Sequence, residues 1–238
     1  MRVLVTGGTG MVGKHLMYHA KTSVDEWEKF VFLSSKDCDL RNKSDVDKLF
    51  SDTKYDAVIH LAARVGGLYD NMAHNAKMFN DNMMMNMNVM SAAFENGVKR
   101  GIFCLSSCVF PAKTDLPMTE SQLHSGRPHH SNRGYAYAKR MVEVLADIYN
   151  EYDAEYICVS PVNLYGEFDN FNIDQGHVIP GLIHKMKLAN DSNGEVVVWG
   201  TGIAHRQFIH AGDLARAIIC LLFISTSRIG FLKKWSIK

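Results

Sequence analysis

Short runs of consecutive apolar residues recur along the chain, and segments of helical character separate them. The runs lie at residues 2–6, 30–34, 57–61, 101–106 and 155–161. Apolar and polar residues do not alternate within them, so each strand is expected to be buried on both faces. Such strands alternating with helices predict a parallel sheet covered on both sides, which is the doubly wound α/β fold class.

The segments between these runs predict helices at residues 11–20, 45–52, 74–96 and 135–152. Two loop-like segments, residues 110–134 and 166–177, follow strand ends. Open α/β sheets bind ligands at such ends, so both loops are candidates for a site. Residues 184–189 and 196–199 look like the start of a smaller lobe.

Composition excludes several classes of protein. The chain has 238 residues, 47% hydrophobic and 21% charged, with a net charge of +1, so no strong field recruits nucleic acid or a membrane surface. The uncharged run at 217–227 is shorter than the roughly 20 residues of a membrane-spanning helix. The first strand begins at residue 2, leaving no room for a targeting segment, and five cysteines without a CxxC pair favour a reducing compartment. We therefore expect a soluble, cytoplasmic protein.

A glycine-rich turn follows the first predicted strand. Residues 7–13 read GGTGMVG, a GxxGxxG pattern between a strand and a helix. Glycine permits a tight turn and close approach of backbone N–H groups to a pyrophosphate, which the helix N-terminus also attracts. The alternative is a turn that needs glycine for geometry only. The pattern predicts a dinucleotide held by Gly7, Gly10, Met11, Val12 and Gly13.

The end of the second strand bears on which dinucleotide is bound. An acidic residue here usually binds the ribose hydroxyls of NAD, but this chain has Ser34, Ser35 and Lys36. A lysine and two hydroxyls suit a 2′-phosphate better, so NADP(H) is favoured over NAD(H). Alternatively, Lys36 is a solvated charge beside Asp37.

Tyr135 and Lys139 form a YxxxK motif at the start of a predicted helix. The spacing places the phenol and ammonium on one face, where a lysine is expected to lower the tyrosine's pKa. Tyr135 could then protonate a carbonyl oxygen as hydride reaches the carbon, with Ser106 hydrogen-bonded to the same oxygen. Tyr137, two residues on, faces away. The alternative is an ordinary exposed Tyr/Lys pair.

These residues resemble the extended short-chain dehydrogenase/reductases. More narrowly, the chain resembles the GDP-L-fucose synthases from about residue 1 to 222. The matching segments are LAARVGG (61–67), LSSCVFP (105–111), YAYAK (135–139), PVNLYG (161–166), DNFNIDQGHVIPGLIHK (169–185), VVVWGTG (196–202) and RQFIH (206–210).

The resemblance implies an NADPH-dependent epimerase-reductase. Such enzymes epimerise GDP-4-keto-6-deoxy-D-mannose at carbons 3 and 5 and then reduce carbon 4, giving GDP-L-fucose. It assigns the two proton transfers to Cys108 and His177, whose side chains titrate near neutrality. Unaided by the resemblance, Cys108 reads as a small buried hydrophobe and His177 as one of 11 histidines.

The resemblance also implies contacts with both ligands. For the cofactor it adds Asp39, Leu40, Ala62, Ala63, Tyr135, Lys139, Asn163 and His177. For the nucleotide sugar it implies Asn163, Lys185, Trp199 and Arg206. Two cations near a pyrophosphate suit a protein without a global positive field, although solvated surface charges are the competing reading. Lys14 stays open between a 2′-phosphate contact and a surface charge.

A methionine-rich stretch lies at residues 82–90. Thioethers without His or Cys more often fill irregular packing than bind a soft metal, so we expect core and dimer packing. The resemblance implies a homodimer through the helices at 74–96 and 135–152. We predict no metal, since His124, His129, His130 and His184 lack ligand spacing.

The expected organisation is an NADP-binding core at 1–166, a partial substrate-binding region at 167–222 and a divergent tail at 223–238. Members of the resembled family extend further, with a part that closes over the nucleotide sugar. Two other functions therefore stay open. One is a catalytically weak form that binds NADP(H) or pairs with a longer partner; the other is a different nucleotide-sugar epimerase or dehydratase.

Overall fold

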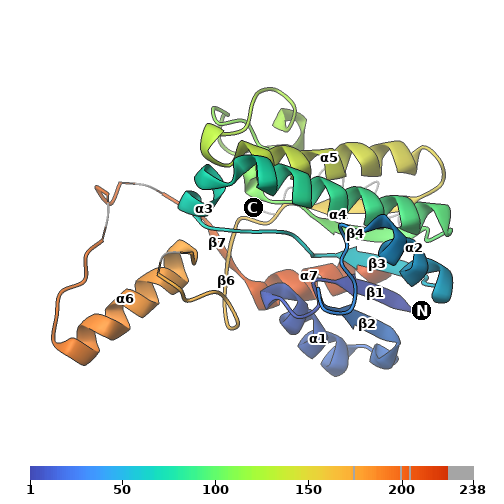
Figure 1. The fold of residues 1–238 in the computed structure, drawn as a ribbon, viewed down its shortest axis with the longest axis horizontal. Coiled ribbons are helices and arrows are strands. Elements are labelled where there is room, and N and C mark those ends of the chain that lie inside the picture. The colour runs from blue at the N-terminus through green and yellow to red at the C-terminus, as the bar shows by residue number, and fades with distance from the viewer. Residues whose placement is uncertain (174, 199, 204, 225–238) are drawn as a thin grey trace.

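A five-stranded parallel sheet forms the centre of the molecule (Figure 1). The computed structural model describes residues 1–173, 175–198, 200–203 and 205–224. Its strand order is β2-β1-β3-β4-β5. The strands are β1 (Val3–Thr6), β2 (Phe30–Leu33), β3 (Ala57–His60), β4 (Arg100–Cys104) and β5 (Glu155–Val159). All five predicted strands are present, and the predicted α/β class is confirmed.

Burial explains why the apolar runs form the inner strands. Every residue of β1 and β3 is buried, because helices cover both faces of the sheet. The chain runs from β1 to β2 on one side and then crosses to β3 on the other side of β1. Doubly wound sheets bind their ligands outside the carboxyl ends of the strands at such a reversal, which here are β1 and β3.

Two helix layers sandwich the sheet (Figure 1). One contains α2 (Lys43–Asp52), α4 (Asn75–Glu95) and α5 (Arg133–Asn150), and the other contains α1 (Met11–Ser23) and α7 (Ala211–Phe223). The side chains of β1 alternate between them: Leu4 packs in the cluster with Val89 of α4, and Val5 packs in the cluster with Ile218 of α7. Each layer thus buries its own apolar core.

The remaining helices agree only in part with the sequence pattern. A predicted helix at 74–96 appears as α4, and α3 (Leu68–Ala73) precedes it as an addition that the sequence pattern did not indicate. Residues 184–189, expected at the start of a smaller lobe, lie within α6 (Val178–Ser192), while residues 196–198 belong to no helix or strand. The 3₁₀ helices are η1 (Trp27–Lys29), η2 (Ser107–Val109), η3 (Glu120–Gln122) and η4 (His130–Asn132).

Beyond β5 a second sheet forms from β6 (Asn163–Tyr165) and β7 (Phe208–His210), which are parallel. The strand predicted at 155–161 ends earlier, as β5 at Val159, and Asn163 begins β6. From β7 the chain returns to the core, where α7 packs against α1, while α6 stands apart from both helix layers (Figure 1). The division at 166/167 stays a prediction, and the tail from residue 225 lies outside the described residues. Among the residues described, no helix combines the length and apolar character that a membrane span requires.

Candidate active site

The glycine-rich turn lies against the carboxyl end of β3. Gly7 has φ +69°, and a Cβ at this position would lie 2.7 Å from the backbone nitrogen of Ala62. A Cβ on Gly13 would lie 2.4 Å from the Gly7 carbonyl oxygen. Only glycine permits this close packing of turn, strand end and helix. Helix α1 begins directly after this turn, with Met11 and Val12 in its first turn, and the N–H groups of a helix N-terminus suit a dinucleotide pyrophosphate.

The loop after β2 carries the residues expected near the adenosine ribose. Lys36 is exposed, but the Ser34 hydroxyl donates to Asp37 Oδ2 at 2.6 Å and is thus already engaged. Asp39 accepts two hydrogen bonds from the Arg41 guanidinium, which lower the pKa of its carboxyl to about 2. Leu40 is buried. Lys36 thus remains the candidate for a 2′-phosphate, whereas Ser34 is bonded within its own loop.

Ala62 and Ala63 follow β3, and helix α4 holds their loop. The Asn82 side chain accepts from the Arg64 N–H at 2.9 Å and donates to the Arg64 carbonyl at 3.0 Å. The Ala62 N–H points to Thr6 Oγ1 at 3.4 Å. The sequence reading did not single out Asn82, although a buried asparagine needs partners of this kind.

Ser106 and Cys108 lie in the turn after β4. Ser106 Oγ accepts from the Cys108 N–H at 3.5 Å. The buried Arg140 of α5 donates from Nε to the Val109 carbonyl at 3.0 Å, which ties this turn to the helix that carries YxxxK. Burial raises the pKa of the Cys108 thiol above its usual value, and the Ser106 hydrogen bond and the Lys139 charge offset this only in part. This corrects the expectation that the thiol titrates near neutrality. Sequence reasoning missed Arg140 because its partners are distant backbone carbonyls.

Tyr135 lies in the first turn of α5, close to this thiol. Burial raises its pKa well above the usual value, and the charges of Cys108 and Cys104 raise it further. This corrects the expectation that Lys139 lowers the pKa of Tyr135. Lys139 is 1% exposed, and its ammonium donates to the Cys104 carbonyl at 2.7 Å, so its charge is directed at the end of β4.

The N-terminus of α5 is fixed from α4. Asn75 Oδ1 accepts from the Gly134 N–H at 2.6 Å, and its amide donates to the Ser131 carbonyl at 3.1 Å. A Cβ on Gly134 would lie 2.1 Å from the Asn75 carbonyl oxygen, so glycine is required here. Asn75 therefore sets the position of the turn that presents Tyr135, a role that its own sequence context did not indicate.

His177 precedes α6 and is paired with Asp169. Its Nδ1 lies 3.6 Å from Asp169 Oδ1, and this carboxylate raises the pKa of the imidazole. The side chain of His177 is 50% exposed, whereas that of Asp169 is 6% exposed. Sequence reasoning missed Asp169, which lies eight positions earlier in the same matching segment.

The loop of His177 reaches the carboxyl edge of the sheet. A Cβ on Gly67 would lie 3.2 Å from the Gly176 carbonyl oxygen, so this loop lies against the residue before α3. Helix α3 in turn contacts η4, which leads into α5. Among the described residues, no hydrogen bond joins His177 to Tyr135 or Cys108. Helix α5, which carries Tyr135, packs against η2, which carries Cys108, and the loop of His177 lies at the same edge of the sheet.

The residues expected to bind the nucleotide sugar lie around the second sheet and α6. The Asn163 amide donates to the Gln207 carbonyl at 2.9 Å, the Lys185 ammonium donates to the Val197 carbonyl at 3.3 Å, and Arg206 bonds the neighbouring His205 carbonyl at 2.7 Å. Trp199 lies outside the described residues. Their substrate contacts stay predictions.

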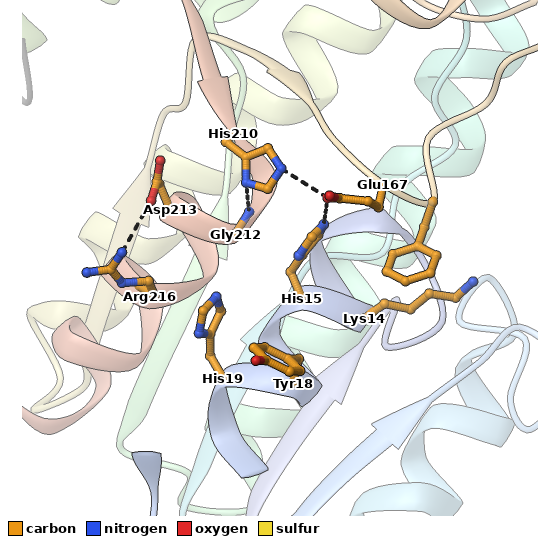
Figure 2. A pocket seen from close by; sticks show the side chains of 10 residues that line it. Lys14, His15, Tyr18, His19, Glu167, His210, Gly212, Asp213 and Arg216 are labelled. Carbon is orange, nitrogen blue, oxygen red and sulfur yellow. Dashed lines mark hydrogen bonds and ion pairs between the residues drawn. The ribbon is translucent and has the colours of Figure 1, made fainter. Parts of the chain in front are cut away.

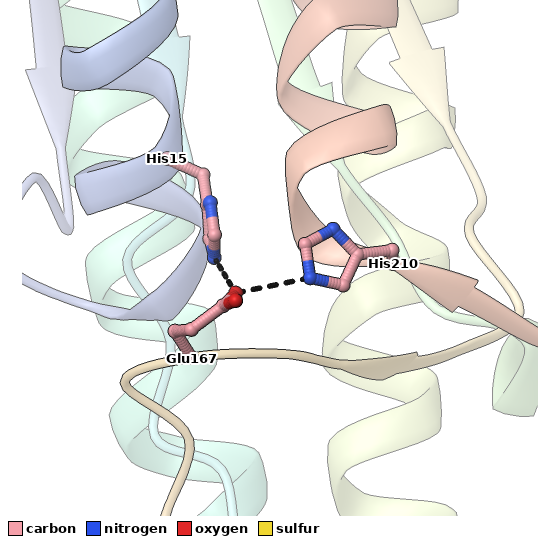
Figure 3. A group of neighbouring side chains, drawn as sticks. All are labelled: His15, Glu167 and His210. Atoms are coloured by element: carbon pink, nitrogen blue, oxygen red, sulfur yellow. Dashed lines mark hydrogen bonds and ion pairs between the residues drawn. The ribbon is translucent and has the colours of Figure 1, made fainter.

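A separate cavity of about 470 Å³ opens between α1, the loop after β6 and the start of α7 (Figure 2). In it, Glu167 Oε2 lies 3.4 Å from His15 Nε2 and 3.0 Å from His210 Nε2 (Figure 3). The sequence reading assigned no role to these three residues. They have metal-ligand chemistry, but His210 Nδ1 accepts from the Gly212 N–H at 3.2 Å.

That bond fixes the tautomer of His210. A neutral ring with an accepting Nδ1 carries its proton on Nε2, which then donates to Glu167. Metal ligation through Nε2 would need this nitrogen bare and would set an N–H on Nδ1 against the Gly212 N–H. Within the cluster, His210 is thus hydrogen-bonded to Glu167, whereas His15 Nε2 lies 3.4 Å from Glu167 Oε2 without a hydrogen bond. The expectation of no metal stays a prediction.

Comparison with known proteins gives a consistent result. The sequence matches the NAD dependent epimerase/dehydratase family over residues 3–225. A GDP-L-fucose synthase of Dictyostelium discoideum is 46% identical over 92% of this chain and 69% of the relative, and a probable GDP-L-fucose synthase of Drosophila melanogaster is 43% identical over 93% and 71%. The crystal structure of a GDP-L-fucose synthetase from Naegleria fowleri bound to NADP superimposes with a TM-score of 0.83 at 44% identity, over 91% of this chain and 71% of that one.

Proposed function

The chain belongs to the NAD dependent epimerase/dehydratase family and groups with its GDP-L-fucose synthases, and on this premise we propose that it is an NADP(H)-dependent epimerase-reductase. Its substrate is GDP-4-keto-6-deoxy-D-mannose and its product GDP-L-fucose. The observation that carries the proposal is the packing of α5, which carries Tyr135, against the Ser106–Cys108 turn, at the sheet edge that also holds the glycine cradle.

The cofactor fits the residues present. Bound NADPH supplies a hydride to carbon 4 of the keto sugar. The turn from Gly7 through Gly10 to Gly13 admits the pyrophosphate because no side chain fills the cradle. Lys36 provides a cation for the 2′-phosphate, Asp39 and Leu40 line the adenosine side, and Ala62 and Ala63 line the opposite wall.

The proton transfers fall to three side chains, and a fourth provides a hydrogen bond. The keto group acidifies the C–H bonds at carbons 3 and 5, so a base on one face of the ring and an acid on the other accomplish epimerisation. Asp169 favours the imidazolium form of His177, which suits it to the acid role, and Cys108 takes the base role. Tyr135 protonates the oxygen on carbon 4 during reduction, and Ser106 hydrogen-bonds that oxygen in both steps.

Lys139 supports this arrangement by holding the strand end. Its ammonium lies near the Cys108 sulfur, where a positive charge favours the thiolate, and near the Cys104 carbonyl, to which it is bonded. On the substrate side, Asn163 and Trp199 contact the sugar nucleotide, while Lys185 and Arg206 neutralise the diphosphate.

Incubation of the protein with NADPH and GDP-4-keto-6-deoxymannose tests the proposal. NADPH consumption at a rate that Tyr135→Phe abolishes, with GDP-L-fucose as the product, supports it. Binding of NADPH without turnover supports instead the weak cofactor-binding form. Formation of a different reduced or epimerised nucleotide sugar assigns the chain to another activity of the family; one relative, a GDP-L-colitose synthase of Yersinia pseudotuberculosis, is 36% identical.

A homodimer through α4 and α5 is the proposed assembly. The methionine stretch divides between two environments: Met90 is fully buried, whereas Met84 and Met87 are 48% and 42% exposed. On α5, Ile148 is 45% exposed. Apolar side chains exposed on both helices suit an interface between two copies. The five free cysteines fit a cytoplasmic location, where thiols stay reduced.

A further inference from the structure

A chain of buried hydrogen bonds crosses the molecule beneath the site. His60, the last residue of β3, is 0% exposed. Its Nδ1 lies 2.7 Å from Thr6 Oγ1 and its Nε2 lies 3.0 Å from Asn86 Oδ1. The Asn86 amide reaches the Ala138 carbonyl of α5 at 3.1 Å. The chain thus runs from the end of β1 through β3 and α4 to α5.

Chemistry fixes the direction of every bond. The Asn86 nitrogen donates to the Ala138 carbonyl, so the Asn86 oxygen faces His60 and can only accept. His60 therefore carries its proton on Nε2, and its bare Nδ1 accepts from the Thr6 hydroxyl. The Thr6 oxygen in turn is placed to accept from the Ala62 N–H at 3.4 Å. If the Asn86 amide were flipped, its oxygen would face the Ala138 carbonyl oxygen, and neither could donate.

The ring of His60 stays in this state across neutral pH. Burial, and then the charge of Lys139, lower the pKa of His60 to about 3, while the hydrogen bond that His60 donates to Asn86 works in the opposite direction. A protonated ring would lose the accepting Nδ1 on which Thr6 depends. His60 is therefore a fixed hydrogen-bond bridge and not a donor of protons to the reaction.

We propose that Thr6, His60 and Asn86 are positioning residues that tie α5, with Tyr135 and Lys139, to the nucleotide loop. Thr6 immediately precedes Gly7, and Ala138 lies between the two residues of the YxxxK pair. The row of hydrogen bonds thus sets the distance between the cofactor and the proton donor. Misplacement of reacting groups by about 1 Å costs up to about 100-fold in rate, so small shifts of α5 matter. The inference rests on the proposed function for its kinetic readout.

Thr6 allows a test that preserves folding. Thr6→Val keeps the shape and strand preference of the side chain but removes the hydroxyl, whereas Thr6→Ser keeps the hydroxyl. We expect Thr6→Val to lower kcat about tenfold with the substrate KM within about twofold, and Thr6→Ser to retain most of kcat. Equal kcat for the two variants overturns the proposal, because a fall in kcat that does not depend on the Thr6 hydroxyl cannot arise from these hydrogen bonds.

Asn86→Leu and Ser91→Ala separate positioning from packing. Ser91 Oγ lies 3.1 Å from Tyr149 Oη and also joins α4 to α5, but more than two turns from Lys139. We expect both variants to lower the thermal midpoint and only Asn86→Leu to lower kcat by about tenfold. An equal fall of kcat in both variants, or none in Asn86→Leu, shows that the bond serves stability alone and overturns the proposal.

Nuclear magnetic resonance of the ¹⁵N-histidine-labelled protein gives a readout that does not need turnover. We expect His60 as the Nε2–H tautomer, unchanged between about pH 5.5 and 8, with its Nε2 resonance shifted in Asn86→Leu. A ring that titrates in this range, or an Nδ1–H tautomer, overturns the inference whatever the activity. If the wild-type chain turns over no sugar while His60 behaves as expected, the proposed function fails and the hydrogen-bond chain stands.

Discussion

The ammonium group of Lys139 donates a hydrogen bond to the backbone carbonyl of Cys104 at 2.7 Å. Cys104 ends β4, and Ser106 and Cys108 follow it within four residues. The lysine of the YxxxK pair therefore holds the strand end that presents the other two proposed catalytic side chains. Because Lys139 is buried, this bond also provides the main hydrogen-bond partner of its charge.

Lys139→Met should impair both halves of the reaction. Loss of the ammonium frees the Cys104 carbonyl and removes the charge that favours the Cys108 thiolate, so epimerisation and reduction each fall by about 100-fold. Proton exchange at carbons 3 and 5 and NADPH oxidation measure the two steps separately. Lys187→Met, at an exposed lysine paired with Asp191 on α6, is the control and should change neither. If Lys139→Met lowered the rate of reduction but not the rate of epimerisation, the role of Lys139 would be limited to assisting Tyr135.

Tyr135→Phe should abolish reduction while leaving the cofactor bound. General acid catalysis contributes about 10²- to 10⁴-fold, so kcat for NADPH oxidation should fall by that factor. NADPH affinity, followed by fluorescence titration, should stay within about threefold. Tyr137→Phe is the matched control, since Tyr137 lies two positions along α5, and its ring packs against the Arg140 guanidinium. Equal effects of the two substitutions would contradict the assignment of Tyr135.

Cys108→Ser should separate epimerisation from reduction. A serine hydroxyl is a far weaker base than a thiolate, so solvent deuterium incorporation at carbons 3 and 5 should fall by about 100-fold or more. Reduction of a keto sugar that is already epimerised should remain near the wild-type rate. Cys220→Ser, at an exposed cysteine on α7, provides the control. If Cys108→Ser slows both steps equally, the division of labour between Cys108 and Tyr135 is wrong.

Asp169→Asn should shift the pH dependence in a defined direction. The Asp169 carboxylate raises the pKa of His177, and the proposed acid must be protonated to act. Activity then falls as pH rises through this pKa, and removing the carboxylate moves the falling limb to lower pH. The pH profile of kcat measures the shift, and Asp191→Asn on α6 is the control. A limb that stays in place, or moves to higher pH, would exclude His177 as the acid that Asp169 supports.

The fold was predictable because its determinants are local in the sequence. The residues of β1 are apolar on both faces because both faces are buried, and this appears directly in the run before Gly7. The glycine pattern is equally local, since the Cβ clashes at Gly7 and Gly13 involve the turn itself and the adjacent strand end. Such constraints determine the residue types at the same positions that they restrict, so the sequence shows them directly.

The site was less predictable because its polar side chains are directed by partners far away in the chain. The i,i+4 spacing places Lys139 near Tyr135, but the choice of the Cys104 carbonyl depends on how β4 meets α5. In the methionine stretch, the sequence reading attended to the thioethers, while Asn82 and Asn86 make the buried contacts. Two asparagines one helical turn apart on a buried face were the available signal, because buried amides require partners.

Met84→Glu tests the proposed dimer. Met84 is 48% exposed on α4, so a carboxylate there costs the monomer little, whereas in an apolar interface two opposed charges would be buried and would repel each other. We expect sedimentation to show a dimer for the wild type and a monomer for Met84→Glu, with the thermal midpoint of the monomeric form indicating an intact fold. Met186→Glu is the matched control, since Met186 is 54% exposed on α6, outside both helices. If Met186→Glu dissociates the protein while Met84→Glu does not, the interface lies on the face of α6; a monomeric wild type would remove the proposal for α4 and α5 altogether.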